Sequence, residues 1–314
     1  MTIIAKKKKK PLATLILLFS FGFVFLLSAA SKPDGGGVAE NRADETAAGT
    51  AEISVAPFSG ISLEAKSAEV FDLATGKAIF ELNPSSQLPL ASLTKIMTAV
   101  VARENLPEWM KVKIPPEAIM QEGDSGLLAG ELWNAEDLAR AMLISSSNDA
   151  AFAFASAFEA VSGRPEAGSS VADFVALMNK KARELGLAQT YFLNPTGLDE
   201  GDGTAGAYGS AKDVVRLLSY AMKKYPSIFE VTRRDFFDVN SRRFKNTNKI
   251  VDNIPLLIAG KTGFSGLAGG NLAIIADVGL GNPIAIVALG SSEEGRFTDV
   301  KTLYEETVKY FKYK

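Results

Sequence analysis

Ser92 and Lys95 lie three residues apart, a spacing that places both side chains on one face of a helix, one turn from each other. A serine becomes a nucleophile when a neighbouring group accepts its proton. The sequence contains no histidine, so neither a Ser-His-Asp triad nor a His-ligated metal centre can be built. The proton acceptor must therefore be a lysine or a carboxylate, and Lys95 has a suitable spacing.

A helix with a buried face, predicted from Leu93 to Ala102, would position this pair. Ser92 would lie at its N-terminus, where unpaired N–H groups and the helix dipole stabilise developing negative charge. An isolated Ser-x-x-Lys sequence is weak evidence, because such motifs arise often by chance. On that alternative, Ser92 is a helix N-cap and Lys95 is a solvated residue of the first turn.

The elements that must hold the pair form two groups of strands with helices between them. Alternating residues predict a hairpin from Ala68 to Leu82 and a second hairpin from Leu272 to Leu289. Helical periodicity dominates from Asn134 to Leu187, and a last helix is predicted from Thr298 to Phe311. We therefore expect an α+β fold, with one sheet built from both ends of the domain and a helical insertion between them.

The N-terminal residues indicate export or membrane anchoring. Lys6 to Lys10 form a block of positive charge, and Pro11 to Ala30 follow without a charged residue. This segment is either a secretory signal, cleaved near Ala30, or a membrane anchor, and its length slightly favours the uncleaved anchor. In both cases the lysines should stay cytoplasmic, so the rest of the chain would lie outside the membrane, in the cell envelope.

Composition divides the remaining chain into a linker and one globular domain. Residues 31–55 are rich in Gly, Ala, Asp and Glu and are typical of a flexible linker after the segment 1–30. Residues 56–314 are expected to form the catalytic domain, because 47% of the sequence is hydrophobic. The net charge of −2 argues against nucleic-acid binding. The absence of cysteine excludes disulfides and cysteine-ligated zinc, and we expect neither metal nor cofactor.

Two further motifs change the meaning of the first pair. Ser146-Ser147-Asn148 lies between two predicted helices, and Lys261-Thr262-Gly263 lies just before the late strands. Taken alone, the first motif fits a helix N-cap cluster and the second fits a turn or a strand edge. In their order along the chain, all three motifs match the active-site signature of serine enzymes that recognise penicillin.

Longer stretches extend this likeness from about Ile61 to the C-terminus, including Pro89 to Thr98, Phe192 to Leu198 and Gly260 to Ser265. On these residues the sequence resembles the D-alanyl-D-alanine carboxypeptidases among the low-molecular-mass penicillin-binding proteins. The resemblance implies a β-lactamase/transpeptidase-like fold, an antiparallel sheet flanked by helices with an all-helical lobe at about residues 116–238. It also implies peptidoglycan stem peptides as substrates and β-lactam antibiotics as covalent inhibitors.

The resemblance also implies roles for individual residues. Ser92 would attack the carbonyl group of the penultimate residue, Lys95 would be the general base, and Ser146 would relay a proton to the leaving amine. We expect burial and the neighbouring Lys261 to lower the pKa of Lys95. Residues of the other motifs, together with one neighbour, would bind the substrate: Asn148, Lys261, Thr262, Gly263 and Phe264.

The backbone N–H groups of Ser92 and Phe264 would form the oxyanion hole. Arg296 is a weaker candidate for carboxylate recognition, and a surface arginine is the equal alternative. Phe264 stands where many carboxypeptidases have histidine, and Ser147 stands where glycine is common in the family. Neither departure removes a reacting side chain.

Three alternative functions stay open on the sequence alone. The chain ends soon after the last predicted hairpin, without the extra β-rich domain of many relatives, so a D,D-endopeptidase that cuts cross-links is one alternative. The second is an inactive cell-wall-binding protein, although all motif side chains are present. The third, a class A β-lactamase, needs a deacylating glutamate in a Glu-x-x-Leu-Asn context that the sequence lacks.

Overall fold

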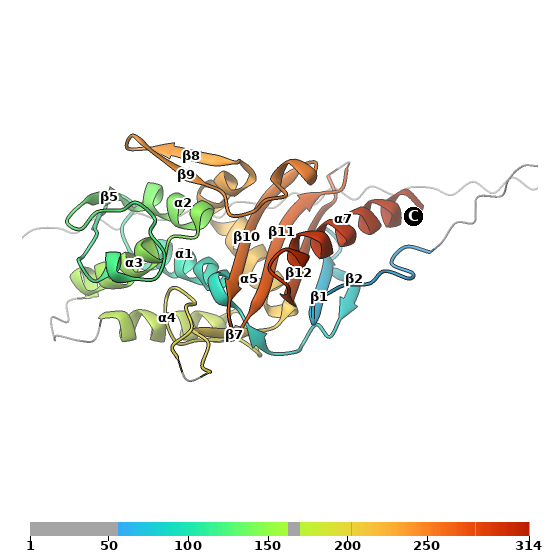
Figure 1. Cartoon of the computed structure of the whole chain (residues 1–314), viewed down its shortest axis with the longest axis horizontal. Coiled ribbons are helices and arrows are strands. Elements are labelled where there is room, and N and C mark those ends of the chain that lie inside the picture. Colours follow the sequence, from blue (N-terminus) through green and yellow to red (C-terminus); the bar gives the residue numbers. More distant parts are fainter. Residues whose placement is uncertain (1–55, 163–169, 202, 280, 314) are drawn as a thin grey trace, which may run out of the picture. The chain divides into compact units, whose positions relative to one another are not determined.

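The protein is described by a computed structural model that covers residues 56–162, 170–201, 203–279 and 281–313 (Figure 1). The predicted signal or anchor at 1–30 and the predicted linker at 31–55 lie outside the described residues. None of the helices in the described part combines the length and apolar character that crossing a membrane requires.

A five-stranded antiparallel sheet is the scaffold of the domain, with strand order β10-β11-β12-β1-β2. The early strands are β1 (Ser67–Asp72) and β2 (Lys77–Leu82). The late strands are β10 (Leu257–Ser265), β11 (Gly269–Asp277) and β12 (Pro283–Ser291). Because β1 pairs with β12, the sheet joins both ends of the domain, as the sequence predicted. The Lys-Thr-Gly motif lies within the edge strand β10, so of its two interpretations, a turn or a strand edge, the strand edge is correct.

Both faces of this sheet are covered, which explains the almost continuous apolar character of its late strands. Leu272 and Ile274 of β11 belong to one core cluster, which includes residues of α7 (Gly295–Tyr313). Ala273 and Ile275 belong to the other cluster, which includes the buried residues of the helical insertion. Successive side chains of a strand point to opposite faces, so one apolar run supplies both cores. Figure 1 shows α7 packed across the strands.

The insertion between β2 and β10 is mainly helical, although the expected lobe at residues 116–238 also includes short strand pairs. Its helices and 3₁₀ turns are η1 (Ala91–Leu93), α1 (Thr94–Asn105), η2 (Ala118–Met120), α2 (Ala135–Ser145), α3 (Asn148–Ser162), α4 (Ser170–Glu184), α5 (Ala211–Lys224), α6 (Pro226–Phe229), η3 (Glu230–Arg233) and η4 (Val251–Asn253). Its short strands are β3 (Leu88–Pro89), β4 (Lys111–Lys113), β5 (Leu132–Asn134), β6 (Tyr191–Phe192), β7 (Ala207–Gly209), β8 (Phe236–Val239) and β9 (Arg242–Lys245).

One acid, Glu69, lies buried in the middle of the sheet. It is paired across the sheet with Val287 of β12 and with Glu81 of β2. Among the described residues its Oε2 atom has no hydrogen-bond partner. Burial raises the pKa of Glu69 to about 7, and the neighbouring charge of Glu81 adds to the effect. The native state therefore retains this proton at pH values where an unfolded chain loses it.

This buried acid predicts a pH dependence of stability. An unfolded glutamate loses its proton near pH ~4.3, so the stabilisation by protonated Glu69 should decrease as the pH rises from there to about 7. Glu69→Gln should reduce this loss and should be more stable than the wild type at pH 8, by on the order of 1–3 kcal/mol. Urea unfolding at pH 5 and pH 8 measures the free energy of unfolding of the wild type and of Glu69→Gln. Glu117→Gln, at an exposed position, is the control. Equal pH dependence of the free energy of unfolding for wild type and Glu69→Gln would contradict the assignment.

Candidate active site

Ser92 lies at the start of a helical segment, as the sequence predicted. It is the central residue of the 3₁₀ turn η1, which runs directly into α1. Ala91 has a φ of +48°, in the left-handed region that residues with a Cβ rarely adopt. The backbone at Gly197 packs against this turn, because a Cβ there would lie 2.0 Å from the carbonyl oxygen of Ala91. The conformation around the serine is therefore fixed by close backbone packing.

Lys95 is completely buried, so the alternative of a solvated lysine is wrong. Its Nζ atom lies 2.9 Å from Ser92 Oγ, 2.6 Å from Asn148 Oδ1 and 2.7 Å from the carbonyl oxygen of Thr196. Burial lowers the pKa of Lys95 to about 7, against an opposing effect of Asp149. A substantial fraction of Lys95 is thus neutral near pH 7 and can accept the proton of Ser92.

The second predicted cause of this low pKa, the charge of Lys261, is not among the causes that shift Lys95; the charge effect acts on Lys261 instead. Lys261 is buried too, and burial, followed by the charges of Lys95 and Arg296, lowers its pKa well below the usual range. The geometry therefore leaves two lysines whose charged forms are both disfavoured, each within hydrogen-bond reach of a serine hydroxyl.

The second motif forms the junction between α2 and α3. Ser146 ends α2 in a left-handed conformation, with φ +63° and ψ +31°, and its Oγ accepts a hydrogen bond from Lys261 Nζ at 2.8 Å. The hydroxyl of Ser147 accepts from the N–H of Ala150 at 3.0 Å, as a helix N-cap does. The capping interpretation thus applies to Ser147, whereas the side chain of Ser146 is directed to the lysine.

Asn148 links this junction to Lys95 and to a neighbouring loop. Its Oδ1 accepts from Lys95 Nζ, and its Nδ2 donates to the carbonyl oxygen of Glu122 at 2.6 Å. The Nδ2 group has a second N–H, which can donate to a substrate while the first contacts Glu122. The role of Asn148 in substrate binding stays a prediction.

The third motif lies on β10, the edge strand of the sheet. Lys261 Nζ also donates to the carbonyl oxygen of Thr262, and the hydroxyl of Thr262 lies 2.6 Å from that of Thr247. A Cβ at Gly263 would lie 2.7 Å from the carbonyl oxygen of Leu90 and 3.3 Å from the backbone nitrogen of Ser92. The strand thus passes directly beside the serine, where an extended peptide can pair with a sheet edge.

Arg296 is buried on α7, so the alternative of a surface arginine is wrong. Its Nη1 donates to the carbonyl oxygen of Gly263 at 2.8 Å, and its guanidinium lies 4.7 Å from the ring centre of Phe297. Phe264 is half exposed, and Arg296 lies 5.8 Å from its ring centre. These contacts support the backbone of β10, and carboxylate recognition by Arg296 stays a prediction.

Sequence reasoning missed several residues that hold the site. Thr196 and Thr247 provide a carbonyl and a hydroxyl, as described above. Asn271 is fully buried on β11, and its Nδ2 donates to the carbonyl oxygens of Pro89 and Leu90, just before the nucleophile. The signal in the sequence was an asparagine in an otherwise apolar strand, because a buried amide must find partners.

The arrangement as a whole suits acyl transfer. It combines a hydroxyl nucleophile with a buried amine of low pKa, a second hydroxyl beside a second lysine, and an open sheet edge. The six side chains of the three motifs lie together beside the middle of β10: Ser92, Lys95, Ser146, Asn148, Lys261 and Thr262.

Comparison with known proteins, like the geometry of the site, points to a serine enzyme of this chemistry. Residues 51–293 match the family model described as D-alanyl-D-alanine carboxypeptidase, peptidase S11. The chain is 34% identical over 258 residues to D-alanyl-D-alanine carboxypeptidase DacF of Bacillus subtilis, which covers 79% of this chain and 63% of that protein. It is 32% identical over 243 residues to a D-alanyl-D-alanine endopeptidase of Escherichia coli, covering 74% of this chain and 72% of the relative.

A solved structure shares the fold. Penicillin-binding protein D2 from Listeria monocytogenes, in its ampicillin-bound form, aligns with a TM-score of 0.65 and 30% identity, over 78% of this chain and 98% of that one. The predicted transpeptidase-like α+β fold is therefore confirmed. Because the family model covers most of the sequence, the chain belongs to the D-alanyl-D-alanine carboxypeptidase family, peptidase S11.

Proposed function

We propose that the protein is a serine-type D-Ala-D-Ala carboxypeptidase that removes the terminal D-alanine from peptidoglycan stem peptides. One observation carries the proposal: a buried lysine with a pKa of about 7 lies 2.9 Å from the hydroxyl of Ser92. Membership of the family supports the choice of substrate. The chain spans 63% of the length of DacF, so the substrate is inferred from the shared catalytic region.

The first half of the proposed reaction forms an acyl-enzyme. Lys95 accepts the proton of Ser92 while Oγ bonds to the carbonyl carbon of the penultimate D-alanine. The N–H groups of Ser92 and Phe264 stabilise the oxyanion, a contribution of roughly 3 kcal/mol per donor. Ser146, held by Lys261, passes its proton to the amine nitrogen and takes up the proton that Lys95 received from Ser92. The C–N bond breaks, and D-alanine leaves.

The second half returns the enzyme to its resting state. Water attacks the ester carbon, the bond to Ser92 Oγ breaks, and the hydroxyl regains its proton. The terminal carboxylate of the substrate is bound near the paired hydroxyls of Thr262 and Thr247, whose oxygens are 2.6 Å apart. Lys261 adds positive potential behind them when it is protonated.

The other functions fit the site less well. An inactive wall-binding protein would have no need for a lysine whose burial is so complete and whose amine contacts the serine hydroxyl. A β-lactamase needs a glutamate to activate the deacylating water, and the sequence lacks the context for it. We therefore propose that β-lactams acylate Ser92 and inhibit the enzyme, since ampicillin is bound to the related penicillin-binding protein D2.

Acylation of Ser92 by penicillin should accelerate as the pH rises through about 7, because only neutral Lys95 accepts the serine proton. Lys95→Arg keeps a permanent charge and should lower the acylation rate constant by about a thousandfold. Intact-protein mass spectrometry after timed exposure to penicillin measures the adduct. Ser92→Ala should form no adduct, and Lys113→Arg, at an exposed lysine, should react normally. Normal acylation of Lys95→Arg would assign the base to another group.

The reaction itself is tested with a pentapeptide that ends in D-Ala-D-Ala. We expect release of free D-alanine, abolished in Ser92→Ala and lowered about tenfold in kcat/KM in Thr262→Ala, which loses a hydrogen bond to a carboxylate. Thr75→Ala, at an exposed turn of the β1–β2 hairpin, is the matched control. Absence of D-alanine from wild-type digests would refute carboxypeptidase activity on this substrate.

We also propose that residues 56–314 act outside the cytoplasmic membrane, held there by an uncleaved N-terminal segment. The support is the lysine block at 6–10 followed by the uncharged residues 11–30. Full-length protein should remain in the membrane fraction after high-salt and carbonate washes, with its N-terminal lysines detectable by mass spectrometry. A mature N-terminus near Ser31 in the soluble envelope fraction would instead indicate a cleaved signal.

A further inference from the structure

Asp149 is a buried carboxylate directly behind the catalytic junction. It follows Asn148 in the first turn of α3, and only 2% of the residue is exposed. Within the described part of the chain no lysine or arginine forms an ion pair with it. A buried charge is costly unless its surroundings compensate for it, so this carboxylate needs a physical reason for its position.

Two features of the structure favour the ionised form of Asp149. Burial raises its pKa, and hydrogen bonds from the side chain and the backbone of Ser125 oppose this rise. The first turn of a 15-residue helix also favours negative charge. The carboxylate oxygen Oδ1 is buried and has no hydrogen-bond partner among the described residues. The charge is therefore only partly compensated, and it acts on other groups in the same dry interior.

A chain of hydroxyl groups joins Asp149 to the second motif. Ser147 Oγ accepts from the N–H of Ala150 and donates to Ser125 Oγ at 2.8 Å. Ser125 Oγ in turn donates to Asp149 Oδ2 at 2.5 Å. Each hydroxyl both donates and accepts, an arrangement in which hydrogen bonds strengthen one another. Ser147 stands where glycine is common in the family, so the chain depends on a side chain that such relatives lack.

The same hydroxyl chain fixes the loop 122–125 on the catalytic junction. The carbonyl oxygen of Glu122 accepts from Asn148 Nδ2 at 2.6 Å, and Ser125 anchors the loop three residues later. A Cβ at Gly123 would lie 3.8 Å from Asn148 Nδ2, so the loop packs against this amide. Because the nitrogen is held on the loop side, the amide oxygen is directed to Lys95. The loop therefore orients one of the acceptors that surround the base.

Asp149 also acts on Lys95 through its charge. Burial lowers the pKa of Lys95 to about 7, and the charge of Asp149 opposes that change. The sheet and α7 contribute the cations Lys261 and Arg296, and the charge of Lys95 helps to lower the pKa of Lys261. The loop contributes Asp124, which is exposed and adds to the rise in the pKa of Asp149. The negative charge of Asp149 thus limits how far burial weakens the base.

We propose that Asp149 is a positioning residue for the acylation step: it holds the loop 122–125 against Asn148, and it places one negative charge behind Lys95. The inference rests on the proposed chemistry of Ser92, because Lys95 is the base for that serine. Asp149 acts through these neighbours and does not itself transfer a proton. Its two effects are separable, since the loop sets the rate of acylation and the charge sets its pH dependence.

The test measures the rate constant for acylation of the full-length protein by penicillin between about pH 5 and pH 9. Asp149→Asn keeps the shape and the acceptor for Ser125 but removes the charge. The midpoint of the pH profile should fall by about one unit, because protonated Lys95 loses a stabilising charge. The rate at high pH should fall about threefold, because a weaker base accepts the proton less readily. Asp149→Glu keeps the charge and should keep the wild-type midpoint.

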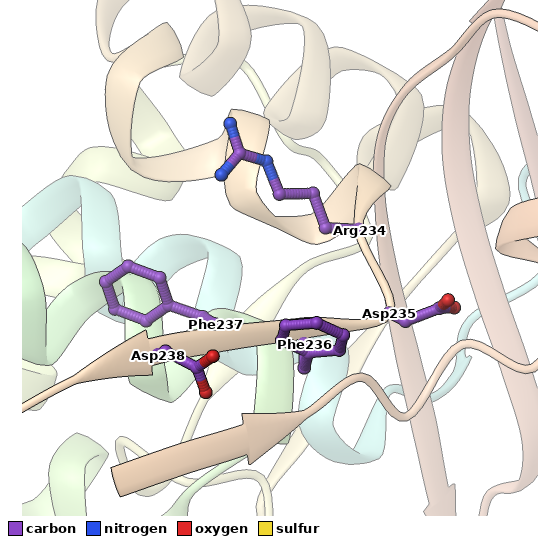
Figure 2. A pocket seen from close by; sticks show the side chains of 5 residues that line it. All are labelled: Arg234, Asp235, Phe236, Phe237 and Asp238. Carbon is purple, nitrogen blue, oxygen red and sulfur yellow. The ribbon is translucent and has the colours of Figure 1, made fainter. Parts of the chain in front are cut away.

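Ser125→Ala tests the loop separately from the charge. It removes the hydrogen bonds to Ser147 and Asp149 but leaves the carboxylate, so the rate should fall about tenfold at an unchanged midpoint. Asp235→Asn is the matched control, because it removes a negative charge at an exposed position. Figure 2 shows Asp235 just before β8, with its carboxylate directed away from Phe237. This control should match the wild type in rate and midpoint, and urea unfolding verifies that each variant folds.

The outcomes separate this inference from the proposed function. A folded Asp149→Asn variant with the wild-type midpoint would overturn the inference, and so would an equal shift in Asp149→Glu or Asp235→Asn. If Asp149→Asn does not fold, Ser125→Ala decides: a tenfold loss supports the inference and a wild-type rate overturns it. Wild-type protein that penicillin does not acylate would refute the proposed chemistry of Ser92 and this inference with it.

Discussion

The burial of Lys95 without a hydrogen-bonded carboxylate among the described residues is the constraint on which the rest of the site depends. Its three hydrogen-bond partners are neutral oxygens: a serine hydroxyl, an asparagine amide and a backbone carbonyl. A buried carboxylate would pair with the ammonium and keep it charged, whereas neutral oxygens in a dry interior do not compensate for lost hydration. The lysine therefore becomes a base near neutral pH, the role that histidine has in other serine enzymes.

Such a lysine is costly to bury, and the fold has to compensate through packing elsewhere. Each of its partners comes from a different segment: Ser92 from η1, Asn148 from the start of α3 and Thr196 from the loop after β6. The hydroxyl of Thr98 on α1 donates to the carbonyl oxygen of Pro195, next to Thr196, and Asn271 ties the chain before Ser92 to the sheet. The catalytic geometry is thus a product of the whole core, because no single element contains it.

Lys261 is the second buried lysine of the site, and it lies beside Ser146, the residue proposed to protonate the leaving amine. Lys261 lies on the edge strand and contacts Ser146, so one hydrogen bond joins this strand directly to the second motif of the helical insertion. Arg296 supports the same strand from α7 through the carbonyl oxygen of Gly263. Beyond Ser146 the loop with Asp124 and the hairpin with Lys245 continue the cleft.

The sequence by itself determined the chemistry and the main elements. The absence of histidine left a lysine or a carboxylate as the base, and the spacing of Ser92 and Lys95 placed both on one helix turn. Strand alternation and helical periodicity predicted both hairpins of the sheet and the helices between them, because these patterns depend on local side-chain direction. The burial of Lys95, the orientation of Ser146 and the positions of Asn271 and Arg296 were decided only in the tertiary structure. They depend on contacts between residues far apart in the chain, and no local pattern encodes how much water such a contact excludes.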